Sequence, residues 1–231
     1  MGPCLPGGRH AVPSRDRRTH GRRCGLSQHS LFDDLPEPVP ANLPEGLAYA
    51  TEFLARDEEQ ALIALIRALP LQAAIYKQYT ARRRVVSFGG SYDDDANKLL
   101  PARPLIEELF PLRARVARWA GVEPQAITHT LVAEYAPGTP LGWHRDVPEH
   151  EEVYGVSLGS TAALRFRPYP PVDPKRADVV KLRAAPRSIY AMRGPARWGW
   201  QHGVAPVDEL RWSITMRTAR TASRQDDELA P

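Results

Sequence analysis

Three side chains with the chemistry of metal ligands, His144, Asp146 and His202, lie in the second half of the chain. His144 and Asp146 are two residues apart, so on an extended strand their side chains leave the same face. Two imidazole nitrogens and one carboxylate on one side of a metal leave coordination positions open, as in non-haem Fe(II) sites. A short His-x-Asp is a weak signal alone, because it occurs often by chance. The segment that follows His202 strengthens it.

That segment, residues 211–217, alternates in the period of a β-strand. One face is apolar and is expected to pack. The opposite face carries two guanidiniums and two hydroxyls, from Arg211, Ser213, Thr215 and Arg217. Burying such a face costs free energy unless an anion binds there, and the planar fork of Arg pairs with a carboxylate in bidentate fashion. A metal cluster followed by this strand is what a dicarboxylate co-substrate that chelates iron would need.

Together these motifs resemble those of the AlkB-like Fe(II)/2-oxoglutarate-dependent dioxygenases, in which His-x-Asp, a distant His and two spaced Arg occur in this order. The stretches 134–138 (Glu-Tyr-Ala-Pro-Gly) and 156–160 (Val-Ser-Leu-Gly-Ser) are also similar to the family. The resemblance covers roughly Leu47 to Arg220. It implies that His144, Asp146 and His202 form the catalytic iron site and that the reaction is oxidative removal of alkyl groups from nitrogen.

The resemblance also implies how 2-oxoglutarate and O2 bind. Arg211, with Tyr135 and Ser213, would hold the far carboxylate of 2-oxoglutarate, and Arg217 would lie near the carboxylate that chelates the metal. O2 would bind at the remaining position on the iron. One departure is Ala133, where many members have Asn, which leaves the near carboxylate one donor fewer.

The elements that position these residues are mainly strands, separated by Pro, Gly and Asp turns. From Ile127 onward the sequence predicts strands at 127–135, 153–158, 163–167, 178–182, 188–192 and 210–218. Short strands without helical periodicity between them predict a double-sheet jelly roll. The expected fold class is therefore α+β, with a double-stranded β-helix (jelly roll) core and supporting N-terminal helices.

Two helices are expected before the jelly roll. Apolar residues recur at helical spacing up to Leu69, and Pro70 ends the run. A second helical region runs from Pro104 to Ala120, and Pro111 inside it should kink or split the helix.

A hairpin is expected between these helices, with residues 82–88 as one strand, Gly89-Gly90 as the turn and Ser91-Tyr92 as the return. In AlkB-like proteins the segment before the core forms a nucleotide-recognition lid, and this hairpin is similar in position and content. Arg84, Phe88 and Tyr92 are the candidate substrate contacts. The alternative is an exposed hairpin whose Phe88 and Tyr92 fold onto the core.

Composition and charge set the remaining expectations. Residues 1–40 are rich in Pro, Gly and Arg and are predicted to be a disordered basic tail, followed by a dioxygenase domain at 41–221 (core about 126–220) and a C-terminal tail at 222–231. The net charge of +4 weakly favours polyanionic partners. Both cysteines, Cys4 and Cys24, lie in the tail, which fits a reducing compartment. We expect a cytoplasmic monomer without a membrane segment.

Three functions fit these observations. The first is oxidative dealkylation of N-alkylated bases in DNA or RNA, with the substrate base single-stranded or flipped out. The second is the same iron chemistry on a protein or small molecule, because family does not fix substrate. The third is an inactive nucleic-acid binding module, which the intact triad argues against.

Four further residues lie near the triad residues in the sequence. Pro148 departs from the family pattern, because some relatives carry a carboxylate there. His150 is an alternative ligand, Arg197 has no assigned role, and Trp143 faces away from the metal by alternation.

Overall fold

The computed structural model describes Pro40 and residues 42–76, 79–93, 98–100, 103–171 and 179–220. The predicted C-terminal tail at 222–231 and, apart from Pro40, the predicted N-terminal tail lie outside these residues. Among the described residues, no helix has the length and apolar character needed to cross a membrane.

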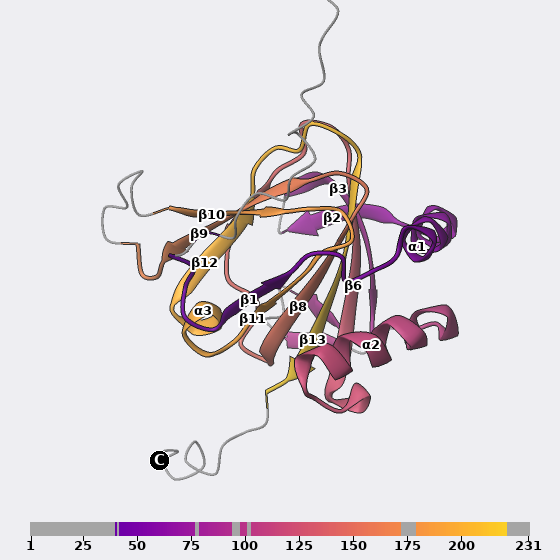
Figure 1. Ribbon diagram of the computed structural model, residues 1–231, viewed down its shortest axis with the longest axis horizontal. Helices are drawn as coiled ribbons and strands as arrows, with labels where there is room; N and C mark the ends of the chain where they lie inside the picture. Colours follow the sequence, from indigo (N-terminus) through magenta and orange to yellow (C-terminus); the bar gives the residue numbers. More distant parts are fainter. Residues whose placement is uncertain are drawn as a thin grey trace, which may run out of the picture. The chain divides into compact units, whose positions relative to one another are not determined.

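Antiparallel strands form the framework, as the jelly-roll prediction requires (Figure 1). The larger sheet contains, in spatial order, β1 (Leu47–Ala50), β11 (Ile189–Met192), β8 (His150–Leu158), β13 (Arg211–Ala219), β6 (Ile127–Tyr135), β3 (Tyr79–Phe88) and β2 (Gln72–Tyr76). The smaller sheet contains β10 (Val180–Ala184), β9 (Ala162–Pro168), β12 (Trp200–Val204) and β7 (Leu141–His144). The predicted double-stranded β-helix is confirmed.

Alternation along the strands creates two apolar layers, one on each face of the larger sheet. On β13, Trp212, Ile214 and Met216 lie in the layer that also contains the helix residues Ile66 and Val116. The second layer lies between the two sheets and contains residues from both, for example Tyr135 from the larger sheet and Leu164, Phe166 and Leu182 from the smaller one. The polar face of β13 therefore points into the interior between the sheets, as its alternation predicts.

Two helices cover the outer face of the larger sheet, on the side away from β9, β10 and β12 (Figure 1). They are α1 (Arg56–Ala68) and α2 (Phe110–Ala120). Pro111 does not kink α2, because it occupies the first turn, where its missing N–H has no intrahelical partner to lose. A separate 3-10 turn, Glu107–Leu109, precedes it, so the predicted helical region is split at this point. A further short helix, α3 (Gly194–Trp198), precedes β12, and a 3-10 turn, Pro124–Ala126, precedes β6.

The predicted hairpin at 82–92 is wrong. β3 pairs with β2 and with β6, whereas β4 (Ser91–Asp93) pairs with β5 (Lys98–Leu100). Gly89 separates the two units: it has φ +85°, and a Cβ there would lie 1.8 Å from the carbonyl oxygen of Thr128. The chain turns out of the larger sheet at this close approach, which only Gly permits.

The six strands predicted from Ile127 onward are present, with ends shifted by a few residues. β1, β2, β5, β7 and β12 were not predicted. β7 and β12 are short and contain Gly142 and Gly203, which lower their strand propensity. They are nevertheless the strands that carry His144 and His202.

The helix-side layer should dominate stability. Ile66 of α1 is completely buried, so Ile66→Ala should lower the free energy of unfolding by about 2–5 kcal/mol through lost burial and a cavity. The matched control, Gln60→Ala on the exposed side of the same helix, should change it by less than about 0.5 kcal/mol. Urea unfolding of both variants measures the difference, and equal values would mean that α1 does not pack on the sheet as described.

Candidate metal centre

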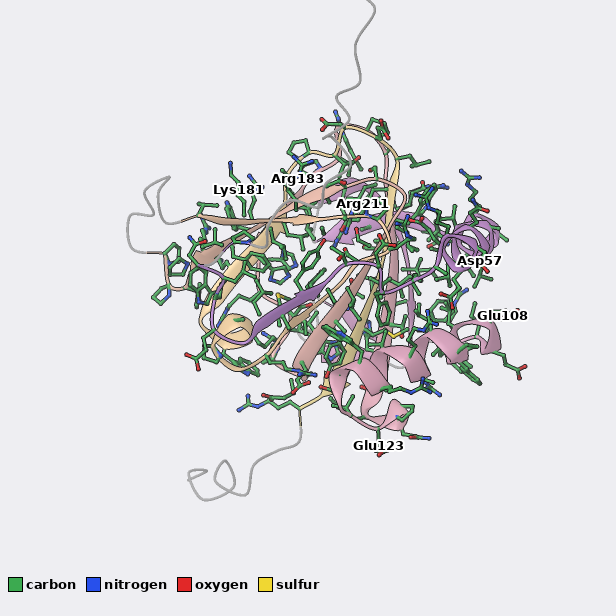
Figure 2. The ribbon with its side chains drawn as sticks, viewed as in Figure 1. Asp57, Glu108, Glu123, Lys181, Arg183 and Arg211 are labelled. Atoms are coloured by element: carbon green, nitrogen blue, oxygen red, sulfur yellow. The ribbon has the colours of Figure 1, made fainter. Side chains whose placement is uncertain are left out.

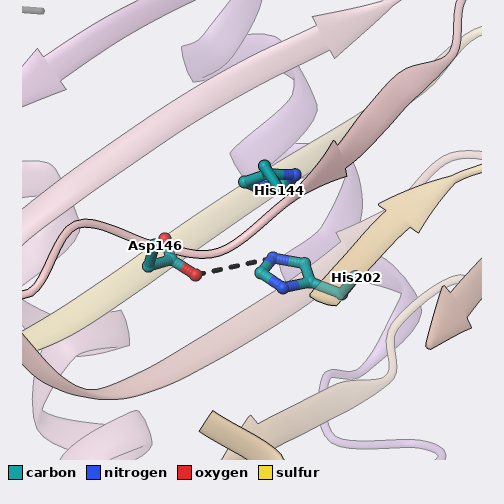
Figure 3. Close-up of side chains that lie close together, drawn as sticks. All are labelled: His144, Asp146 and His202. Carbon is teal, nitrogen blue, oxygen red and sulfur yellow. Dashed lines mark ion pairs between the residues drawn. The ribbon is translucent and has the colours of Figure 1, made fainter. Parts of the chain in front are cut away.

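The three predicted ligands meet at one point in the interior, at the end of the smaller sheet (Figure 3). β7 and β12 are antiparallel neighbours whose register places His144 opposite His202, and Asp146 follows two residues after β7 ends. One donor atom from each side chain lies within 4.8 Å of the others. The two imidazole centroids are 4.2 Å apart, and Nε2 of His202 is 3.4 Å from Oδ2 of Asp146. Among the described residues, no other group of three potential ligands meets the same distance limit.

The backbone around the cluster selects which ring nitrogen of His144 is available. Nδ1 of His144 lies 3.0 Å from the carbonyl oxygen of Gly142, which can only accept a hydrogen bond. Nδ1 therefore carries the proton and Nε2 keeps its lone pair, as a metal ligand requires. Gly203 permits this close strand pairing, because a Cβ there would lie 2.8 Å from the carbonyl oxygen of Leu141.

The charge state of the cluster also suits a cation. Burial lowers the pKa of His202 to about 3, assisted by the neighbouring His144, and burial likewise lowers the pKa of His144. Burial alone would raise the pKa of Asp146, but the Arg217 guanidinium, followed by the two imidazoles, outweighs it and holds this pKa well below its usual range. At neutral pH the cluster is two neutral imidazoles and one carboxylate, with no proton to displace.

Arg217 holds the carboxylate of Asp146. Its Nε and Nη2 lie 2.7 and 2.6 Å from Oδ1 of Asp146, so both donors engage the same oxygen and Oδ2 is buried without a hydrogen-bond partner. Arg197, which had no assigned role, is 2% exposed and binds the loop after β7. Its Nη2 donates to the carbonyl oxygens of Asp146 (3.1 Å), Val147 (2.7 Å) and His150 (2.9 Å). Two guanidiniums therefore fix the side chain and the backbone of one candidate ligand.

One further histidine, His129, contacts Arg217, and a second, His150, lies beside His129. Nη1 of Arg217 donates to Nδ1 of His129 at 3.1 Å, and the ring centroids of His129 and His150 are 4.9 Å apart. Burial, followed by the charge of Arg217, lowers the pKa of His129 to about 3 and that of His150 to about 4. His150 is thus placed beside His129, outside the three-residue cluster, and the sequence carried no signal for His129.

Arg211 occupies the interior between the sheets, 1% exposed. Its Nε donates to Oγ of Ser157 at 3.3 Å, and its Cζ lies 5.0 Å from the ring centroid of Tyr135. Nη1 is buried without a hydrogen-bond partner, and the buried Ser213 follows on the same face. A buried guanidinium with an unsatisfied N–H is costly, and a carboxylate would satisfy it. The sequence pointed to Ser157 only as part of the family-like stretch 156–160. The pairing of β8 with β13 brings it to Arg211.

Tyr190 also faces this interior, although no sequence pattern pointed to it. Burial raises the pKa of its phenol to about 12, although the nearby Arg211 opposes the shift. Gly155 makes room for it, because a Cβ there would lie 2.2 Å from the Tyr190 ring. The phenol is therefore a neutral hydrogen-bonding group beside Arg211.

Two of the three predicted substrate contacts, Arg84 and Phe88, lie away from this site. Arg84 forms an ion pair with Glu134 (2.7 Å) on the helix-facing side of the larger sheet. Phe88 is 1% exposed in the helix-side layer, so for this residue the alternative, packing onto the core, is what the structure shows. Tyr92 lies in β4, and its side chain is outside the described part of the structure. From this segment it is Arg83, on the other face of β3, whose charge acts on His144 and lowers its pKa.

The sequence model described as the 2OG-Fe(II) oxygenase superfamily matches residues 46–222, which contain the whole cluster and both interior arginines. The chain belongs to this superfamily. The oxygenase is a 2-oxoglutarate-dependent dioxygenase that uses Fe(II), 2-oxoglutarate and O2, and the AlkB-like resemblance stated from the sequence is confirmed.

Two relatives and one solved structure illustrate the relationship. A Xenopus tropicalis protein named tRNA (carboxymethyluridine(34)-5-O)-methyltransferase alkbh8 is 24% identical over 74% of this chain and 27% of its own length. An Arabidopsis thaliana protein named Alkylated DNA repair protein ALKBH8 homolog is 26% identical over 79% of this chain and 57% of its own length. The oxygenase thus spans less than two thirds of either relative. The solved structure of OsALKBH1, 17% identical, has a TM-score of 0.59 over 76% of this chain and 99% of that chain, which shows the shared fold.

The residues present fit the two groups that the superfamily uses. Oδ2 of Asp146 and Nη1 of Arg211 are both buried without hydrogen-bond partners. A divalent cation would satisfy the first and a carboxylate the second.

The buried His129 should make stability depend on pH. Its folded pKa of about 3 lies below the ordinary value of 6.5, so the unfolded chain takes up a proton that the folded protein refuses, and stability falls as pH drops below 6.5. His129→Gln keeps an acceptor for Arg217 but cannot titrate. It should reduce the loss of unfolding free energy between pH 7 and pH 5 by about 2 kcal/mol. Urea unfolding of metal-free protein measures this, and an unchanged pH dependence would show that His129 already titrates normally when folded.

Proposed function

We propose that the oxygenase removes alkyl groups from the nitrogens of nucleic-acid bases, with Fe(II) held by His144, Asp146 and His202. The observation that carries the proposal is the convergence of these three side chains within 4.8 Å, in a fold whose interior also holds a buried arginine, Arg211, with an unsatisfied donor. Arg211, with Tyr135, Ser213 and Ser157, would hold the far carboxylate of 2-oxoglutarate. Arg217 would keep Asp146 ionised and oriented, a role closer to the metal ligand than the sequence suggested.

When bound, Fe(II), 2-oxoglutarate and O2 supply the oxidising chemistry, which converts 2-oxoglutarate to succinate and CO2 and places one oxygen atom on a substrate C–H bond. The chain's own residues position and shield this chemistry. The neutral imidazoles donate lone pairs, and the contact of Arg217 with Oδ1 aims Oδ2 of Asp146 at the cluster. The apolar layer between the sheets, with Phe166 and Leu164, excludes water. Hydroxylation of an N-methyl carbon yields formaldehyde and the bare base.

Nucleic acid is the substrate class that we favour over protein or small molecule. The names of the relatives refer to tRNA in one case and to alkylated DNA in the other. The basic composition, with a net charge of +4, favours a polyanion, and Arg83 places a further cation within electrostatic reach of His144. A base in a duplex would have to be flipped out to reach the interior. We also propose that the protein is cytoplasmic, as expected from its cysteines, and that it is a monomer.

Activity should depend on the buried carboxylate. With Fe(II), 2-oxoglutarate and N-methylated single-stranded DNA or RNA, the wild type should release formaldehyde. Asp146→Asn should reduce this rate by at least about 100-fold, because an amide neither neutralises the cation nor pairs with Arg217. Asp57→Asn, an exposed carboxylate on α1 (Figure 2), is the matched control and should behave as wild type. Formaldehyde release by Asp146→Asn at the wild-type rate would refute the ligand assignment. Turnover of 2-oxoglutarate without formaldehyde release from DNA or RNA would favour a protein or small-molecule substrate. Absence of any 2-oxoglutarate turnover would favour an inactive nucleic-acid binding module.

The co-substrate requirement should depend on Arg211. Arg211→Gln removes the charge that would pair with a buried carboxylate, so the KM for 2-oxoglutarate should rise about 100-fold or more, corresponding to about 3 kcal/mol. Arg118→Gln, an exposed arginine on α2, is the matched control. Succinate production at varied 2-oxoglutarate concentrations measures both. An unchanged KM in Arg211→Gln would place the co-substrate elsewhere.

A further inference from the structure

The outer face of the smaller sheet is strongly basic. Along β9 and β10, Leu164, Phe166 and Leu182 point into the interior, so the residues between them point outward. We use the name outer basic face for the outward-facing charged and aromatic residues of this sheet, Trp143, Arg165, Arg167, Lys181 and Arg183. Lys181 and Arg183 extend away from β10, whereas the labelled acidic residues lie over the helices (Figure 2).

Like charges face each other across this sheet. The register of β9 and β10 places Lys181 directly opposite Arg165, a cross-strand arrangement that is destabilising unless an anion lies between or above the two groups. The other outward positions of these strands and β12, at Ala163, Gln201 and Gly203, carry no carboxylate. Asp208 is the acidic residue that lines the adjacent hollow of about 420 Å³ with Lys181 and Arg183. Within the described residues the face thus keeps a net positive charge.

An aromatic ring lies within this group of cations. The guanidinium carbons of Arg165 and Arg167 lie 5.0 and 4.5 Å from the ring centroid of Trp143. Nε of Arg167 donates to Oε1 of Gln201 at 2.8 Å, which orients that guanidinium, whereas Nε of Arg165 is buried without a hydrogen-bond partner. Cations beside an aromatic ring are the combination by which proteins bind the backbone and bases of single-stranded nucleic acid.

The outer basic face is continuous with the metal centre through one strand. Trp143 and His144 are consecutive residues of β7, with Trp143 on the outer face and His144 in the cluster. β7 is the edge strand of its sheet, so a chain that crosses this edge passes from Trp143 to the cluster without crossing another strand. From β10 to β7 the face spans three strand spacings, about 14 Å. Beyond β7, Arg145 stacks on Tyr169, with its Cζ 3.8 Å from the ring centroid.

We propose that the outer basic face binds the phosphates and a base of a single-stranded nucleic acid next to the nucleotide that is oxidised at the metal centre. This inference rests on the proposed function and extends it: the substrate is a strand that continues over the edge of β7, and the neighbouring nucleotides contribute to its affinity. Free nucleosides, which lack flanking phosphates, gain nothing from this surface.

The test compares two double variants that remove the same charge. Lys181→Gln/Arg167→Gln removes two cations from the outer basic face, and the control Arg56→Gln/Arg118→Gln removes two exposed cations from the helices. Binding of a fluorescein-labelled, N-methylated single-stranded oligonucleotide is measured by anisotropy between about 50 and 200 mM salt. The first variant should raise Kd roughly tenfold or more and reduce the slope of log Kd against log salt by about 1.4. The control should match wild type.

A second readout separates this inference from the proposed function. The ratio of formaldehyde released from the oligonucleotide to that released from the methylated nucleoside should fall in the first variant and stay constant in the control. If wild type oxidises the oligonucleotide but the first variant has the same Kd and salt slope, this inference alone is overturned. If wild type neither binds nor oxidises nucleic acid, the inference and the proposed function both fail.

A membrane surface is the alternative partner of the outer basic face. If the wild-type protein binds phosphatidylserine vesicles through these residues, and binds no oligonucleotide, the face serves a membrane surface and the inference is wrong. Matched melting temperatures, with Lys181→Gln alone as a milder variant, exclude misfolding as the cause.

Discussion

The buried ion pair between Arg217 and Asp146 links the central strand of the larger sheet to the loop that follows β7. Two contacts of 2.6 and 2.7 Å keep Asp146 ionised in an interior that would otherwise favour its protonation. One carboxylate oxygen is engaged and the other is left toward His202. Burying either charge without its partner would cost free energy. The position of this loop and that of the larger sheet are therefore coupled through the ion pair. The pair therefore gives the site one defined geometry.

The alternation of β13 makes this possible. Its apolar side chains complete the layer under α1 and α2, and its polar side chains enter the space between the sheets. The same strand thus stabilises the fold and supplies Arg211 and Arg217 to the site. A shift of register by one residue would exchange these faces, so the apolar packing that fixes the strand also fixes where both guanidiniums point. Ser157, Tyr190 and His129 complete the polar interior from the neighbouring strands.

The two faces of the smaller sheet also carry different kinds of residue. Its inner face contributes His144, His202 and an apolar lining, while its outer face carries arginines and a tryptophan. Cations in cross-strand contact oppose folding, as do the buried guanidiniums inside. Both arrangements gather positive charge, and an anionic partner would balance each: on our proposals, a carboxylate beside Arg211 inside the sheets and phosphates outside.

The sequence alone predicted the chemistry of the site: His144 and Asp146, and the two-faced strand from Arg211 to Arg217, follow from residue type and a spacing of two. His202 was expected as the third ligand only if the fold brought it close to them. The sequence also determined the jelly roll, because long alternating strands such as β6 and β13 specify their buried face locally. Which strands pair, and what surrounds the three candidate ligands, became known from the tertiary structure. It replaced the expected hairpin by separate pairings, put Phe88 in the core and brought Arg83 toward the metal centre. Such contacts join residues far apart in the chain, and their geometry depends on close approaches such as that of Gly89 to Thr128, which no local pattern encodes.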